Sequence, residues 1–171
     1  MNSDKTLFPP VFKAFFRKAA VRCTGIAVVF AGIAVAAALA TYRISDPSFN
    51  TATGEAPRNV LGYFGSYLAD TLWQYFGFGA LLFPTALVAW GIIVIRLKWR
   101  KLQMLRVACF IPTLLLVLIL LSALPFAAGW PVYAGAGGAV MPAFYMPVIA
   151  LLKKAYFPYP AFVIQPIVFV A

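Results

Sequence analysis

The chain has 171 residues, of which 64% are hydrophobic and 11% are charged. Soluble domains carry roughly 45–50% apolar and about 25% charged residues, so this composition predicts a membrane protein. With no histidine and only four acidic residues, the chain offers no clustered imidazole, thiolate or carboxylate groups. We therefore expect no metal site, no cofactor and no acid–base catalysis.

The formal net charge is +10, and the basic residues gather where apolar segments end. In a soluble protein such a charge would suggest nucleic acid as a partner. Here the pattern is typical of cytoplasmic loops, so we expect membrane lipids with anionic headgroups to be the partner. The two cysteines, Cys23 and Cys109, lie in different apolar segments, and we expect two reduced thiols.

Residues 1–23 are predicted to form a basic amphipathic leader. Helical spacing after Pro9-Pro10 places basic and aromatic residues together, which favours a short helix on the inner leaflet. The residues concerned are Lys5, Lys13, Arg17, Lys18, Arg22, Phe12, Phe15 and Phe16. A signal peptide is the alternative, but the apolar run that follows is longer than a signal sequence requires.

The first membrane span is predicted at about residues 24–42, close to the ~20 apolar residues that cross a bilayer. It is rich in alanine and glycine, and the pairs Ala31–Val35 and Gly32–Ala36 each lie one helical turn apart. Small residues let a second helix approach closely within lipid, so we expect this stripe to pack against another span.

Residues 43–71 are predicted to form a polar loop outside the cytoplasm, because the basic leader places the N-terminus inside. The loop contains every acidic residue except Asp4. Asp46, Pro47 and Ser48 should end any helix, since aspartate and serine favour turns and proline restricts the residue before it. Loops of about 30 residues are more often functional than simple connectors.

A new helical pattern begins at Asn59, and Gly62, Gly65 and Ala69 share one face of it. Asp70 would then lie at the edge of the hydrocarbon, where a carboxylate needs a partner or water. We expect an ion pair with Arg43 or Arg58, a contact with a partner protein being the alternative. The candidates for packing or interaction are Asp46, Pro47, Ser48, Asn50, Asn59, Gly62, Gly65 and Asp70.

Two further spans are predicted, at about residues 72–95 and 107–128, joined by a basic cytoplasmic turn. Pro84 should loosen the second span. The sequence LLLVLILL in the third span has no polar side chain, so we expect it to face lipid. Residues 135–138 are predicted to be a flexible, glycine-rich linker.

Residues 139–171 are apolar but interrupted by prolines, and they predict an irregular fourth span. The chain stops within this apolar segment, which we interpret as a truncated gene product or a fragment. The expected fold is all-α, a polytopic membrane bundle of four transmembrane helices, or of three plus a broken fourth.

The spacing from Tyr42 through Asp46-Pro47-Ser48 to Asn50, followed by Asn59, Gly62, Gly65 and Ala69-Asp70, resembles one family closely. It is similar to the N-terminal four-span membrane domain of the FtsK/SpoIIIE DNA translocases over about residues 20–130. The resemblance implies an anchor in the bacterial inner membrane, with a cytoplasmic N-terminus, at the division septum in cell division and chromosome segregation. It also implies a homo-oligomer that contacts other division-septum membrane proteins.

The P-loop pattern GxxxxGK[ST] of that family's motor is absent from the 171 residues. The resemblance therefore implies no catalysis here, and contact with DNA and ATP only through a motor domain that these residues lack. The alternative function is a small transporter or channel subunit. Against it, the polar residues within the spans, Thr85, Thr113, Ser122 and Gln165, are scattered, whereas transport sites gather such groups.

Overall fold

The computed structural model describes residues 10–97, 101–122, 135–144 and 146, and the regular elements among them are helical. These are α1 (Pro10–Ala40), α2 (Gly62–Phe76), the 3-10 helix η1 (Gly77–Leu81), α3 (Leu82–Ile95), α4 (Lys101–Ala108) and α5 (Phe110–Ser122). The prediction of an all-α fold is confirmed for these residues.

Three helical stretches in the described part of the chain are long and apolar enough to cross a membrane. They are Val11–Ala40, Gly62–Ile95 and Met104–Ser122, which agrees with three of the predicted spans. The backbone at 140–144 is helical, whereas most of the predicted fourth span, 139–171, lies outside the described residues.

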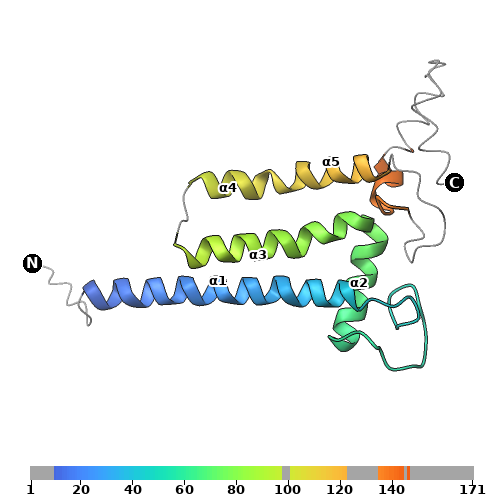
Figure 1. Cartoon of the computed structure of the whole chain (residues 1–171), viewed down its shortest axis with the longest axis horizontal. Helices are drawn as coiled ribbons and strands as arrows, with labels where there is room; N and C mark the ends of the chain where they lie inside the picture. The colour runs from blue at the N-terminus through green and yellow to red at the C-terminus, as the bar shows by residue number, and fades with distance from the viewer. Residues whose placement is uncertain (1–9, 98–100, 123–134, 145, 147–171) are drawn as a thin grey trace, which may run out of the picture.

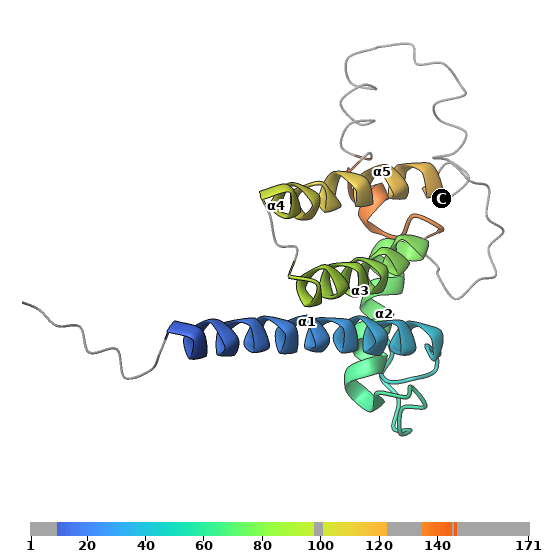
Figure 2. The same cartoon turned by 60° about the vertical axis from the view of Figure 1, so that its left-hand side comes forward.

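The helices α1, α3 and α4–α5 lie side by side, with α3 in the middle (Figures 1 and 2). The chain reverses direction between α1 and α3, and again between α3 and α4. Helix α2 instead crosses this layer steeply at the end where α1 stops (Figure 1). Residues 41–61 and 135–144 gather at this same end, opposite the N-terminus of α1.

Helices α1 and α3 pack closely because glycine lies at their contact. A Cβ atom added to Gly25 would lie 2.8 Å from the carbonyl oxygen of Gly91, and one added to Gly32 would lie 2.8 Å from Cγ2 of Val88. Both α1 glycines are buried, whereas Ala31 and Ala36 are exposed. The two glycines at the contact are seven residues apart, a spacing found in left-handed helix pairs. Of the predicted stripe, Gly32 lies at the contact, whereas Ala31 and Ala36 do not.

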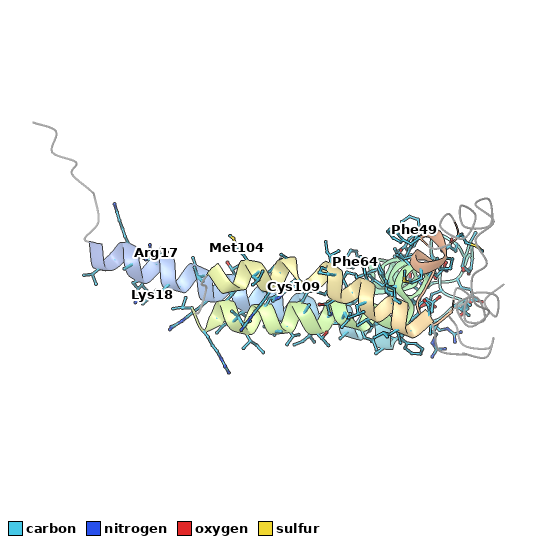
Figure 3. All side chains as sticks on the ribbon, turned by 90° about the horizontal axis from the view of Figure 1, so that it is seen from above. Arg17, Lys18, Phe49, Phe64, Met104 and Cys109 are labelled. Carbon is cyan, nitrogen blue, oxygen red and sulfur yellow. The ribbon has the colours of Figure 1, made fainter. Side chains whose placement is uncertain are left out.

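Helix α1 begins at Pro10, so residues 10–23 continue the first span and do not form a separate helix. Proline is favoured at the first helical position, and neither glycine nor proline interrupts residues 11–24. The 31 residues of α1 extend about 46 Å, longer than the ~30 Å hydrocarbon core. Arg17 and Lys18 lie on the part that projects past the end of α3 (Figure 3).

The second crossing contains a change of direction that the sequence did not predict. Residue 72, its expected start, falls inside α2, and the turn comes at Gly77, whose φ of +51° strongly favours glycine. Pro84, which was expected to loosen this span, lies in the first turn of α3, where proline is tolerated, directly after the 3-10 helix η1.

Two apolar clusters hold the described helices together. One forms where α2 crosses α1, from Ala38, Leu39, Ala69, Leu72, Trp73 and Ala80. The other joins Leu114 and Leu118 of α5 to Met141. The prediction that LLLVLILL faces lipid is thus wrong for these two leucines, although Leu116, Ile119 and Leu120 are exposed.

Candidate functional site

Residues 41–61 fold back onto the end of α1 and one side of α2, and we call this arrangement the loop cap. The last carbonyl groups of a helix have no partner within the helix. The side-chain amide of Asn59 donates to the carbonyl of Ala38 at 2.8 Å, and the indole N–H of Trp73 donates to that of Leu39 at 3.3 Å. Asn59 of the loop and Trp73 of α2 thus supply donors for two of the last carbonyl groups of α1.

Asp46 joins the start of the loop to its end. Its buried carboxylate accepts hydrogen bonds from the backbone N–H groups of Arg58 at 3.1 Å and Asn59 at 2.9 Å. The side-chain oxygen of Asn59 in turn accepts from the N–H of Leu61 at 3.1 Å. These bonds close the loop just before α2 begins, so both residues act inside the cap.

Gly65 provides the space in which the Asn59 side chain lies. A Cβ at position 65 would overlap the side-chain oxygen of Asn59 and lie 2.6 Å from Cβ of Leu61. Gly62 has a different role from the one expected of it. A Cβ there would meet nothing within 4 Å, but its φ is +61°, so Gly62 permits the turn into α2 and does not belong to the packing face.

The loop cap is also fixed to α2 through Pro47 and Ser48. The hydroxyl of Ser66 donates to the carbonyl of Pro47 at 2.7 Å. The Ser48 hydroxyl oxygen accepts from the backbone N–H groups of Asn50 at 3.2 Å and Thr51 at 3.1 Å, which makes a tight turn. This turn presents Phe49, which is 79% exposed and packs edge-on against Tyr67 with ring centroids 4.8 Å apart.

Asp70 is only 2% exposed and accepts three hydrogen bonds from neutral groups. The Tyr42 hydroxyl donates at 2.8 Å, the Gln74 amide at 2.8 Å and the Asn50 amide at 3.1 Å. The Asn50 amide nitrogen also donates to the Gln74 side-chain oxygen at 2.9 Å. Asp70, Asn50 and Gln74 therefore form a closed ring, which we call the Asp70 ring.

The expected ion pair between Asp70 and Arg43 or Arg58 is not formed. Both arginine side chains are exposed, and the carboxylate contacts seen in the described residues come from the neutral donors of the preceding paragraph. Hydrogen bonds to an ionised acceptor are stronger than neutral ones. Three of them can hold a buried carboxylate without an opposite charge.

Residues 135–138 are a packed turn and not the flexible linker that was expected. The N–H of Phe78 donates to the carbonyl of Ala136 at 2.9 Å, and the N–H of Ala139 donates to that of Gln74 at 2.8 Å. A side chain on Gly77 would overlap the Ala136 carbonyl, and one on Gly138 that of Tyr75. Glycine is required at these positions because two stretches of backbone lie in direct contact. The turn therefore packs against the junction of α2 and η1.

Several residues of the cap were missed by the sequence analysis, although signals for them existed. Gln74 is four residues after Asp70, the spacing at which helical side chains meet. Trp73 carries an indole N–H, which needs an acceptor when buried. Tyr42 belonged to the quoted motif but was given no role. The sequence analysis expected a positively charged partner for Asp70 and therefore named Arg43 and Arg58 instead of these neutral donors.

The cap is built to hold a shape. Among the described residues, no group of three or more histidine, cysteine, aspartate or glutamate side chains could hold a metal ion. Every buried side-chain nitrogen and oxygen in this described part has a hydrogen-bond partner. The buried polar groups of the cap are therefore engaged within the fold, where they hold the loop in place.

The fold and the cap define a polytopic α-helical membrane domain whose helix ends are closed by an ordered polar loop. The family model for the 4TM region of DNA translocase FtsK/SpoIIIE matches residues 17–151. The chain therefore belongs to this family, as its motif indicated.

Individual relatives agree with the family match. The chain is 40% identical to DNA translocase FtsK of Rickettsia bellii over 91 residues, which is 53% of this chain and 12% of the relative. It is 32% identical to DNA translocase FtsK of Agrobacterium fabrum over 132 residues, covering 76% and 15%. The protein of the same name from Rhizobium meliloti is 34% identical over 114 residues, covering 67% and 13%.

The chain thus spans about an eighth to a seventh of the length of these relatives. It corresponds to their 4TM region, and the 171 residues contain no GxxxxGK[ST] run. No solved structure matches the fold significantly.

Proposed function

We propose that this chain is the membrane-anchoring and protein-interaction domain of an FtsK-type DNA translocase, and that it tethers the translocase at the division septum. The observation that carries the proposal is the motif of the 4TM family, folded here into an ordered cap at one end of a membrane bundle. A loop held by this many internal bonds has a defined surface to offer a partner.

The orientation in this proposal has a cytoplasmic N-terminus and an external cap, in the inner membrane. Arg17 and Lys18 lie on the part of α1 farthest from the cap (Figure 3), Arg96 directly follows the end of α3 that is opposite the cap (Figure 1), and Arg106 belongs to α4, which follows that end in the chain. Short loops rich in lysine and arginine stay in the cytoplasm. The proposed orientation is thus supported by the position of these basic residues, which lie away from the cap along the bundle.

The mechanism in this proposal is binding, without catalysis by these residues. The buried cap residues fix the loop, and exposed groups such as Phe49 and Val60 are offered to other division-septum membrane proteins. Exposed aromatic residues on a rigid support lose little conformational entropy on binding. The domain also assembles as a homo-oligomer, and DNA and ATP are engaged by a motor region outside these residues.

A fluorescent fusion of the chain in dividing bacterial cells tests the proposal. The fusion is expected to form a band at the division site, and Phe49→Ala is expected to weaken the band without changing the amount in the membrane. Ala52→Ser, at an exposed position of the same loop, is the matched control. Uniform membrane fluorescence of the unaltered chain would refute the septal role, and solute flux through liposomes holding the purified chain would favour the transporter alternative.

A further inference from the structure

We propose that α2 lies in the plane of the membrane boundary, with one long edge in contact with the lipids of the outer leaflet. Helix α2 crosses the spans steeply in two different views (Figures 1 and 2). A helix in that direction adds little to the depth crossed by the chain. The depth of its 15 residues in the membrane is therefore set by the environment that their side chains favour.

The length of the second crossing sets that level. After the turn at Gly77, five residues of η1 and 14 of α3 lead to Ile95. At the usual rise per residue these extend about 31 Å, which equals the ~30 Å hydrocarbon thickness. The crossing is complete without α2, so α2 lies where the hydrocarbon meets the headgroups.

One edge of α2 has the composition of a lipid contact. Phe64, Leu68, Thr71 and Tyr75 follow one another at spacings of four, three and four residues, which places them along one edge of the helix. Phe64 is 71% exposed and Tyr75 is 53% exposed. None of the four is charged, and the Thr71 hydroxyl donates within the helix to the carbonyl of Tyr67 at 2.8 Å. This edge therefore presents aromatic and apolar surface to lipid. Its threonine adds no unpaired hydroxyl group, because that hydroxyl is already bonded within the helix.

The other sides of α2 are already occupied. Ala69 and Trp73 are buried against the end of α1. Gly65 lies against Asn59 of the loop cap, and Ser66 and Asp70 are bonded to that cap. Along the long axis of the bundle, Phe64 lies between Cys109 of the third span and Phe49 of the cap (Figure 3). Phe64 thus lies nearer to the spans than Phe49 does, at the level where this proposal places lipid around the bundle.

This contact would fix how deep the domain sits. Aromatic residues partition to membrane interfaces, and helices with an apolar side lie in the interface plane. With α2 held there, the loop cap stands above the headgroups and Phe49 points away from lipid. The assignment to the outer leaflet rests on the orientation in the proposed function, whereas the contact with lipid and its depth hold whether or not the domain localises to the septum.

Spin-label accessibility in liposomes tests this inference. The chain would carry Cys23→Ser and Cys109→Ser, with one nitroxide-labelled cysteine at a time in place of Phe64 or Tyr75. Tyr63, on another side of the same helix and also exposed, and Glu55 in the loop provide matched controls. Collision with oxygen, which dissolves in lipid, is compared with collision with a water-soluble nickel chelate.

We expect the oxygen-to-nickel ratio at positions 64 and 75 to be several-fold higher than at positions 63 and 55. A ratio at positions 64 and 75 equal to that at position 55 would place the edge in water and overturn the proposal. Low collision rates with both reagents at these positions would also overturn it, since the edge would then be covered by protein, either a second copy or another chain. Because all four side chains are exposed, the labels need not displace packed groups.

Discussion

Asp70→Ala tests how the loop cap is held, because it removes the acceptor of three hydrogen bonds at once. A hydrogen bond contributes about 1 kcal/mol net, so the loss of three should favour local opening of the cap by about 3 kcal/mol. Every 1.4 kcal/mol corresponds to a tenfold change in equilibrium. The open population should therefore rise about 100-fold.

Asp70→Asn should have a smaller effect, which the Asp70 ring allows us to work out. In the ring, Asn50 and Gln74 both donate to Asp70, and Asn50 also donates to Gln74. An asparagine at position 70 has only one acceptor oxygen, so its amide nitrogen meets another donor. Exchanging the positions of oxygen and nitrogen in the Asn50 or Gln74 amide removes this conflict but brings two donors or two acceptors together at another contact of the ring. One bond is lost whichever way the amides turn, which corresponds to about 1 kcal/mol and about a fivefold larger open population.

Trypsin added outside liposomes that hold the chain provides the assay, since Arg58 lies in the cap and its backbone is bonded to Asp46. When opening is fast relative to cleavage, the cleavage rate follows the open population. Asp70→Ala should therefore be cut after Arg58 about 100-fold faster than the unaltered chain, and Asp70→Asn about fivefold faster. The exposed substitution Ala52→Ser should leave the rate unchanged. Equal rates for Asp70→Ala and Ala52→Ser would refute the role of the ring, and equal rates for the two Asp70 variants would refute the count of bonds.

Three further substitutions test the packing and the caps. Asn59→Ala leaves the carbonyl of Ala38 and the backbone N–H of Leu61 without these partners. It should lower the midpoint of thermal unfolding in detergent by an amount equivalent to about 2 kcal/mol or more. An unchanged midpoint would contradict the capping role. Gly91→Val should abolish disulfide crosslinking between cysteines engineered into α1 and α3, whereas Ala89→Val, at an exposed position of the same helix, should preserve it; equal crosslinking in both would remove the case for a glycine contact. Gly138→Ala combines a φ of +70° with contact against backbone and should unfold at a clearly lower temperature than Gly54→Ala, where a Cβ meets nothing within 4 Å; similar midpoints would show that the turn at 135–138 is not tightly packed.

The sequence predicted the helical class and the approximate positions of three crossings, because long apolar runs and basic flanks are local features. It did not predict that α2 would be a transverse helix. Hydropathy treats Tyr67, Leu68 and Trp73 as continuous with the apolar run after Gly77, and no local pattern reveals the positive φ at that glycine. The direction of α2 is set by where it packs on α1.

The residues of the cap could be found from the sequence, but not their connections. Asp46, Asn59 and Asp70 were singled out as polar residues in a membrane chain. Apart from Gln74, four residues after Asp70, their side-chain partners are 20 and 28 residues away. The other partners are backbone groups, and spacing alone does not bring these together. The contact between the 135–138 turn and Gly77 is longer in range still, so a run of small residues was interpreted as a linker.

The central claim is that the loop cap faces the outside of the cell and the basic helix ends face the cytoplasm. The most direct measurement labels single cysteines with a membrane-impermeant maleimide in intact cells, in the Cys23→Ser, Cys109→Ser background. The account predicts that cysteine at Glu55 reacts in intact cells, and that cysteine at Arg17 reacts only after the membrane is permeabilised. Reaction of position 17 but not position 55 in intact cells would contradict it.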